Sequence, residues 1–167
     1  MNQLKQNINL LNAEKKVWQI LETVCDPEVP VLTILDLGIV RDVRIDENVI
    51  EVVITPTYSG CPAMDAISMD IRLKLIEHGY KNIKIISVLS PAWTTDWMSE
   101  EGKQKLKEYG IAPPQVSGQS KGPDSLPPCP QCHSQNTKLL SQFGSTACKA
   151  LYQCQDCKEP FDYFKCH

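Results

Sequence analysis

Apolar side chains recur at helical spacing near the start of the chain. Four of them occupy the i, i+3, i+4 and i+7 positions of one helix face: Val17, Ile20, Leu21 and Val24. The run ends at Asp26-Pro27, and a residue that precedes proline is disfavoured in helical conformation. The pattern predicts an amphipathic helix over residues 13–24, with Cys25 as a core residue at its end.

Two β-branched runs come next, and a short polar turn separates them. Residues 38–45 and 49–57 are rich in Val, Ile and Thr, and the segment 46–48 between them is typical of a tight turn. These runs predict an antiparallel hairpin. A later β-branched run, residues 82–90, predicts a third strand.

Two further helices are predicted around the third strand. The first, over residues 62–78, ends at Gly79 and carries four apolar residues on one face: Met64, Ile67, Ile71 and Leu75. The second lies within residues 91–110, because capping residues open this segment and its acids precede its lysines, as the helix dipole favours. Trp93 and Trp97 are four residues apart in it, which favours packing over an aromatic patch for a partner. The order αββαβα indicates an α+β layer fold.

The chain divides at residues 112–128, where five prolines, two glycines and three serines leave little to bury. We interpret this segment as a linker. It separates an α+β domain, residues 1–111, from a small C-terminal domain, residues 129–167. The second domain is too short to be stable by apolar burial alone, so it requires a further stabilising element.

Composition narrows the class of function. The chain has 167 residues, 42% of them hydrophobic, and its formal net charge of −3 provides no basic surface for a nucleic-acid backbone. No apolar stretch is long enough to span a bilayer and the N-terminus has no signal-peptide pattern. We therefore expect a cytoplasmic protein without a nucleic-acid or membrane partner. In that reducing compartment its eight cysteines favour metal binding or catalysis over disulfides.

Paired cysteines in the C-terminal domain predict a metal site. Cys129 and Cys132 form one CxxC pair, Cys154 and Cys157 form a second, and two such turns present four thiolates to a tetrahedral ion. We predict a structural Zn²⁺ in a four-cysteine zinc ribbon. Disulfides are the first alternative, disfavoured by the absent signal peptide. A redox CxxC is the second, disfavoured because neither pair follows a βαβ pattern.

Cys61 lies in "TPTYSGCPAM", residues 55–64, where the second strand ends and a helix begins. With Pro62 at the first helical position, Cys61 is expected at the N-cap, where backbone N–H groups and the helix dipole favour a thiolate. Gly60 leaves room beside it for a ligand. We interpret Cys61 as a nucleophile or a ligand for a soft metal, and the alternative is a small buried hydrophobe.

Two carboxylates flank Pro27 in "CDPEVP", residues 25–30. The prolines keep this loop out of helical conformation, so Asp26 and Glu28 can point at a neighbouring site. The alternative is that both acids are solvated or cap a helix end. Spacing alone favours that ordinary role.

These motifs together resemble the PaaD family, the D proteins of the bacterial phenylacetate-degradation system. The resemblance is carried, in order, by "DPEVPVLTILDLGIVRDV", "TPTYSGCPAM", "PAWTTDWMS", "EYGIAPP", "CPQC" and "FGSTACKALYQC". The first 111 residues alone are similar to the iron-sulfur-assembly domain of SufT-type proteins. That resemblance singles out four residues: Asp26, Glu28, Thr55 and Cys61. The two CxxC pairs distinguish the PaaD type, and Val29 stands where that family often has Ile.

The resemblance implies an accessory protein of phenylacetyl-CoA epoxidase, a multicomponent oxygenase whose reductase component carries a [2Fe-2S] cluster. It implies a maturation factor for that cluster, with Cys61 as a transient ligand for iron or the cluster. The implied partners are the reductase component, other epoxidase subunits and the iron-sulfur assembly machinery. One cysteine is too few to hold a cluster in a monomer, so a homodimer, a small thiol or the client would supply further ligands.

Two other classes of function stay open. One is a structural or docking subunit of the oxygenase without cluster chemistry of its own. The other is an enzyme with Cys61 as nucleophile, which is least favoured because His78, the histidine of the first domain, lies at the far end of the helix. Cys148 and Cys166 have no role that spacing discloses.

Overall fold

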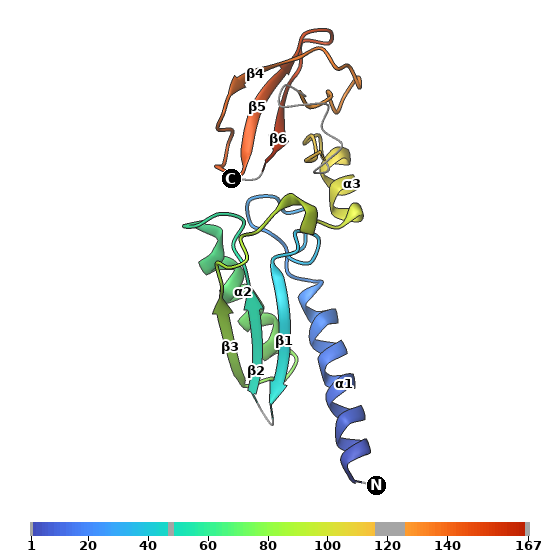
Figure 1. Cartoon of the computed structure of the whole chain (residues 1–167), viewed down its shortest axis with the longest axis vertical. Coiled ribbons are helices and arrows are strands. Elements are labelled where there is room, and N and C mark those ends of the chain that lie inside the picture. The colour runs from blue at the N-terminus through green and yellow to red at the C-terminus, as the bar shows by residue number, and fades with distance from the viewer. Residues whose placement is uncertain (1, 47–48, 116–125, 166–167) are drawn as a thin grey trace.

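The computed structural model describes residues 2–46, 49–115 and 126–165 of the chain. These residues form three α-helices, one short 3-10 helix and two three-stranded sheets (Figure 1). The predicted α+β class is therefore confirmed. Most of the predicted linker, two residues of the predicted hairpin turn, and Cys166 with His167 lie outside the described residues.

The regular elements of the first domain follow the predicted order. They are α1 (Asn2–Leu21), β1 (Val40–Asp46), β2 (Val49–Ile54), α2 (Ala63–Glu77), β3 (Asn82–Ser87) and α3 (Glu100–Glu108). The predicted bounds of the first helix are wrong: α1 begins before residue 13 and ends before residue 24. Cys25 is consequently exposed rather than a core residue, and it pairs with Thr33 in an isolated β-bridge. No helix in the described ranges is long and apolar enough to cross a bilayer.

The last helix of this domain, α3, occupies only the second half of the segment 91–110 in which it was predicted. The Ser99 hydroxyl accepts a hydrogen bond from the Gly102 N–H at 2.8 Å, so Ser99 is the N-cap of α3. The residues before it contain only the 3-10 helix η1 (Thr95–Trp97). An earlier capping residue was expected to open the helix, but the chain continues in extended conformation after η1 instead.

The two tryptophans pack, although neither lies on α3. Trp93 is buried, and its Nε1 donates a hydrogen bond to the Leu37 carbonyl at 2.8 Å. Trp97 is half-buried beneath Arg41, whose guanidinium carbon lies 3.5 Å from the ring centroid. Both side chains therefore fix loops to the first domain, which corrects the expected role in helix packing.

The first sheet has the order β1-β2-β3, in which β2 is antiparallel to β1 and parallel to β3. α1 and α2 contact each other and the sheet, and the shared core includes these residues: Ile50, Val52, Ile54, Ile67, Ile71 and Leu75. On the other face of the sheet, Glu51 pairs with Arg44 at 3.3 Å and with Lys84 at 3.2 Å. This alternation of an apolar and a charged face is typical of a two-layer fold.

Asp36 holds the long segment 22–39 between α1 and β1. Its carboxylate accepts hydrogen bonds from the Thr33 N–H and hydroxyl at 3.0 Å and from the Ser99 hydroxyl at 2.9 Å, and it pairs with Lys105 at 2.9 Å. Burial raises the pKa of Asp36, but these donors together hold it below its usual value. The loop is therefore tied to the start of α3.

The C-terminal sheet consists of β4 (Thr137–Ser141), β5 (Lys149–Cys154) and β6 (Pro160–Phe164). Its strands are antiparallel in the order β4-β5-β6. One CxxC pair precedes β4, and the other begins at the last residue of β5 and continues into the turn before β6. This arrangement places both pairs at one end of the sheet, as expected for a zinc ribbon, and we refer to residues 129–165 as the ribbon.

The ribbon is docked on the loops at the carboxyl end of β2 and β3 (Figure 1). The Ala112 N–H donates to the Asp162 carbonyl at 2.8 Å, and the Phe164 N–H donates to the Ala112 carbonyl at 2.9 Å. Phe164 is 2% exposed and belongs to the same apolar cluster as the first domain. Its ring meets the Trp93 ring edge-on at a centroid distance of 6.3 Å. The two parts of the chain therefore share an apolar contact.

Candidate functional site

Cys61 lies in the connection between β2 and α2, but it is one residue before the N-cap of α2 rather than at the N-cap, as was expected. α2 begins at Ala63, and Pro62 takes the N-cap position without a side-chain hydrogen bond. The Cys61 sulfur accepts a hydrogen bond from the Ala63 N–H, and its carbonyl accepts one from the Met64 N–H at 3.3 Å. Cys61 therefore caps the first turn of α2 from outside the helix.

The expected stabilisation of the Cys61 thiolate is not observed. Burial raises the pKa of this thiol, and the hydrogen bond from the Ala63 N–H offsets part of that effect. The Glu28 carboxylate raises the pKa further, while hydrogen bonds with Tyr58 and Thr57 lower it, and the net shift is upward. A thiol that ionises only when a cation replaces its proton suits a metal ligand better than a nucleophile.

The space beside Cys61 is open. Gly60 has a φ of +83°, in the left-handed region that favours glycine, and a Cβ at this position would meet no atom within 4 Å. Cys61 itself is only half-buried. A ligand or a client side chain can therefore approach the sulfur from the side of Gly60.

Thr55 lines a cavity of about 260 Å³ next to these residues. The cavity lies between the β2–α2 connection and the segment after β3, and it is lined by Thr55, Pro56, Thr57, Tyr58, Ser59, Leu89, Ala92 and Trp93. Thr55 is 1% exposed, and its Oγ1 has no hydrogen-bond partner. Among the residues that the structure describes, it is the single buried side-chain oxygen or nitrogen in this condition. An orphaned buried hydroxyl costs stability, so this one favours a ligand in the cavity.

Asp26 caps its own loop. Its Oδ1 accepts hydrogen bonds from the Glu28 N–H at 2.8 Å and the Val29 N–H at 2.7 Å, and the side chain is buried. Burial raises the pKa of Asp26, although the two N–H groups and the Lys149 ammonium lower it in part. The contacts of Asp26 fix the backbone of this loop and with it the place of Glu28.

Cys148, to which spacing assigns no role, lies against Glu28. The Cys148 thiol donates to Glu28 Oε2 at 3.5 Å, and the Thr146 hydroxyl lies 3.0 Å from the same sulfur. Cys148 is 5% exposed. Burial raises its pKa to about 11, with a further contribution from Glu28 that exceeds the opposing effect of Lys149. We call Cys61, Glu28 and Cys148 the interdomain cluster.

Lys149 adds a buried positive charge next to this cluster. It is 6% exposed, and its Nζ lies 3.8 Å from Asp162 Oδ2. Its ammonium also acts on Asp26 across the domain contact. The buried Asp26 therefore lies within the electrostatic influence of a buried cation of the ribbon, which reduces the cost of bringing its carboxylate out of water.

The four ribbon cysteines that spacing predicts as ligands converge. Their sulfur atoms all lie within 4.8 Å of one another: Cys129, Cys132, Cys154 and Cys157. The Cys129 and Cys157 sulfurs are 3.7 Å apart, and those of Cys132 and Cys154 are 3.5 Å apart. Zn–S bonds of about 2.3 Å in a tetrahedron separate the sulfurs by about 3.8 Å, so this group fits a four-coordinate metal site. Among the residues that the structure describes, the donor atoms of the interdomain cluster do not converge as closely as these four sulfurs.

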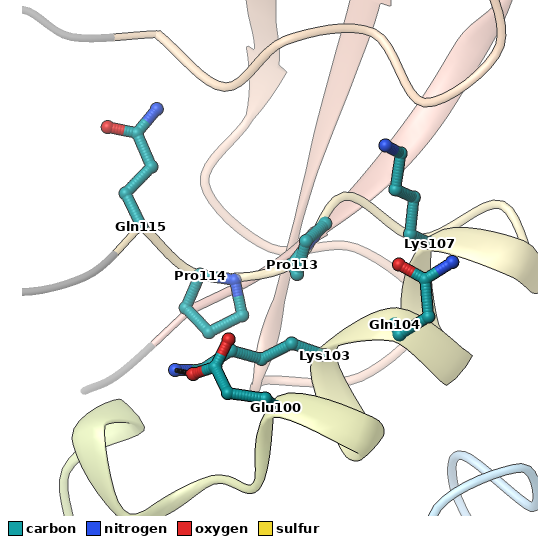
Figure 2. A pocket seen from close by; sticks show the side chains of 7 residues that line it. All are labelled: Glu100, Lys103, Gln104, Lys107, Pro113, Pro114 and Gln115. Carbon is teal, nitrogen blue, oxygen red and sulfur yellow. Dashed lines mark hydrogen bonds and ion pairs between the residues drawn. The ribbon is translucent and has the colours of Figure 1, made fainter.

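Two other surface features carry no comparable chemistry. A groove of about 360 Å³ lies between α3 and residues 113–115 (Figure 2), and its charged residues include the Glu100–Lys103 ion pair at 2.7 Å. Its lining residues include no thiol. His78, the candidate base for a Cys61 nucleophile, is the C-cap of α2 at the opposite end of a 15-residue helix from Cys61, about 22 Å away.

Two family profiles match the chain. One, described as the PaaD zinc beta ribbon domain, matches residues 113–165, and the other, described as an iron-sulfur cluster assembly protein, matches residues 14–79. A protein of Escherichia coli K12, named as a subunit of 1,2-phenylacetyl-CoA epoxidase, is 49% identical over 154 residues. That match covers 90% of this chain and 92% of the relative.

The first domain alone has further relatives. A Porphyromonas gingivalis protein named as an Fe-S protein maturation auxiliary factor is 37% identical over 102 residues, covering 60% of this chain and 96% of that protein. The crystal structure of a DUF59 domain from Bacillus anthracis matches with a TM-score of 0.57 and 32% identity, covering 60% of this chain and 96% of that one. The fold of the first domain is therefore that of this domain class.

Proposed function

This chain belongs to the PaaD family, and on that premise we propose that it is an accessory protein of phenylacetate catabolism that matures an iron-sulfur cluster. The client that fits best is the reductase component of phenylacetyl-CoA epoxidase. The relative that matches 90% of this chain is named for a subunit of that epoxidase, and the relative that matches the first domain is named for Fe-S protein maturation.

One observation carries the proposal: a half-buried Cys61 stands beside an open space and within the electrostatic influence of Glu28. Thiolate and carboxylate together are a ligand set that iron accepts. Asp26 positions Glu28 through the capped loop, and the orphaned Thr55 hydroxyl supplies a polar contact for bound cargo. The open geometry favours transient binding and transfer over storage.

The ribbon has a separate, structural role in this proposal. Its four converging thiols favour Zn²⁺, which holds tetrahedral thiolate sites without redox chemistry. Because the ribbon is small, the metal would supply most of its folding free energy. Direct catalysis is not part of the proposal, since the proposed ligand Cys61 has a raised pKa and His78 is remote.

The second candidate function is a docking subunit of the oxygenase. The observation that favours it is the apolar contact through Phe164, which fixes the ribbon on the first domain as a single recognition unit. A docking subunit would bind zinc in the ribbon and no iron. The two candidates therefore differ in the metal content of the purified protein.

The test is the iron, acid-labile sulfide and zinc content of protein purified without oxygen. The wild type is compared with two variants, Cys61→Ser and Cys25→Ser. We expect all three proteins to contain zinc, and we expect iron in the wild type and in Cys25→Ser but not in Cys61→Ser. Cys25 is the matched control because it is an exposed free thiol of the same domain. Zinc alone in all three proteins, after expression with the assembly machinery, would favour the docking subunit.

A further inference from the structure

The contact between Cys148 and Glu28 joins residues 120 positions apart and crosses the domain boundary. Cys148 does not belong to either CxxC pair, and its sulfur is not part of the four-sulfur group of the ribbon. Glu28 in turn acts on Cys61, the thiol of the first domain. One carboxylate therefore contacts the Cys148 thiol of the ribbon and acts electrostatically on the Cys61 thiol of the first domain. Cys61 also packs against the apolar cluster that contains Cys148.

A purely structural cysteine does not account for this arrangement. A buried cysteine that only fills space behaves as a small hydrophobe and packs among apolar groups. Cys148 instead has its sulfur against a carboxylate oxygen and a hydroxyl, at 3.5 Å and 3.0 Å. A thiol sulfur and a carboxylate oxygen in contact are two donor atoms that a single cation can bind at the same time.

We propose that Cys148 is the second thiolate of a metal site shared by the two domains, with Cys61 as the first thiolate and Glu28 as an oxygen ligand. The site would take a divalent iron, alone or as the corner of a cluster. The inference rests on the proposed function, and it replaces the expectation that a homodimer or a small thiol supplies the second thiolate. The ribbon supplies it within one chain.

The chemistry of this donor set suits transfer. Two thiolates and one carboxylate leave at least one position of a four-coordinate ion free, so that a client thiolate can enter. On binding, the metal replaces the proton of each thiol, and both protons pass to solvent. The donor atoms of the interdomain cluster do not converge as closely as the four ribbon sulfurs do, so they must move toward one another when the metal binds.

The arrangement also gives the docked ribbon a direct role. Cys148 lies just before β5, whose position is set by the contact of Phe164 with the first domain. The site is complete only while the ribbon is docked. Release of the ribbon would remove one thiolate and weaken the hold on iron at the moment of transfer.

The probe is Co²⁺, titrated without oxygen into the full chain after the ribbon has been loaded with zinc. Thiolate-bound Co²⁺ gives a sulfur-to-metal charge-transfer band, so the band counts the thiolates on the bound ion. We expect Cys148→Ser and Cys61→Ser each to remove about half of the band and to weaken Co²⁺ binding by about 10- to 100-fold. Cys25→Ser is the control, with band and affinity unchanged.

Glu28→Gln provides a second, independent readout. It removes an oxygen ligand and neither thiol, so binding should weaken while the band per bound Co²⁺ keeps its full intensity. Because Cys148 is buried, Cys148→Ala is measured beside Cys148→Ser, and zinc content and far-UV circular dichroism confirm that both fold. If these variants do not fold, the Glu28→Gln result still decides, since an unchanged affinity there contradicts the site.

An unchanged band and affinity in Cys148→Ser would overturn the inference and leave Cys61 as the only thiolate. So would a wild-type chain that binds no Co²⁺ beyond the zinc site. The first result leaves the proposed function standing, because Cys61 would then bind the cargo without Cys148. The second would also favour the docking subunit, and the cluster content of the client in cells decides between the two functions. Conversely, full client maturation in cells with Cys61→Ser would refute the proposed function while the shared metal site stood.

Discussion

Replacing Phe164 with alanine should release the ribbon from the first domain while leaving the four-cysteine site intact. Phe164 is 2% exposed, packs edge-on against Trp93 and lies in the core cluster of the first domain rather than in that of the ribbon. Removing a buried phenylalanine side chain costs about 3–5 kcal/mol. Because solvent can enter an interface once it opens, we expect the lower end, about 3 kcal/mol, which is roughly a 150-fold change in the docked-to-released ratio.

The assay follows two reporters of docking in the zinc-loaded chain. The first is the rate at which an alkylating reagent modifies Cys148, which is 5% exposed while the ribbon is docked. The second is hydrogen exchange of the Ala112 amide, which donates to the Asp162 carbonyl. Both rates should rise by about 100-fold if they report the released state. Zinc content should not change.

Phe161→Ala is the matched control. Phe161 is also buried, but it packs with Cys129, Cys154 and Ala112 in the ribbon's own cluster. The same truncation there should loosen the ribbon itself and its hold on zinc. If Phe164→Ala loses zinc as readily as Phe161→Ala does, or leaves Cys148 as protected as in the wild type, the reasoning about the interface is refuted.

Three further predictions concern residues described above. Asp36→Asn should lower the free energy of unfolding by about 2–3 kcal/mol at pH 7, because Lys105 and two hydroxyls then lose a carboxylate. Since the folded pKa of Asp36 is lowered, its contribution is complete above the unfolded pKa of about 3.9 and is lost as the pH falls through the folded pKa, so the two proteins should converge in chemical denaturation at low pH. Cys154→Ser should abolish zinc binding and unfold only the ribbon, as seen by proteolysis, and a fully metallated, folded variant would contradict this. Thr55→Val should raise the unfolding free energy by up to about 1 kcal/mol, because it removes an orphaned hydroxyl, while client maturation falls; a loss of stability would mean that the hydroxyl is satisfied.

Local patterns were sufficient to predict the elements that depend on nearest neighbours along the chain. The spacing of Ile67, Ile71 and Leu75 identified the buried face of α2, and the β-branched runs identified the hairpin, because both depend on one element's own periodicity. Helix ends were less predictable. α1 ends before its apolar pattern does, since Val24 is buried from the following loop.

The candidate site was only partly predictable, because half of it depends on contacts between distant segments. The sequence indicated Cys61 and Glu28 but held no signal that Cys148 would lie beside Glu28, since that contact depends on how the ribbon docks. The predicted ionisation of Cys61 was wrong for a related reason: the helix terminus is visible in the sequence, whereas burial and the Glu28 charge are not. The division of the chain at residue 112 stays a prediction.

The most direct test of the central claim is the cluster content of the client. The reductase component of the epoxidase would be isolated without oxygen from cells in which this protein carries Cys61→Ser, with Cys25→Ser as control, and its iron and acid-labile sulfide measured per chain. We predict a reductase largely without its [2Fe-2S] cluster in the Cys61→Ser cells and a full cluster in the control. A full complement of iron and sulfide in both would contradict the claim that this protein acts on the cluster through Cys61.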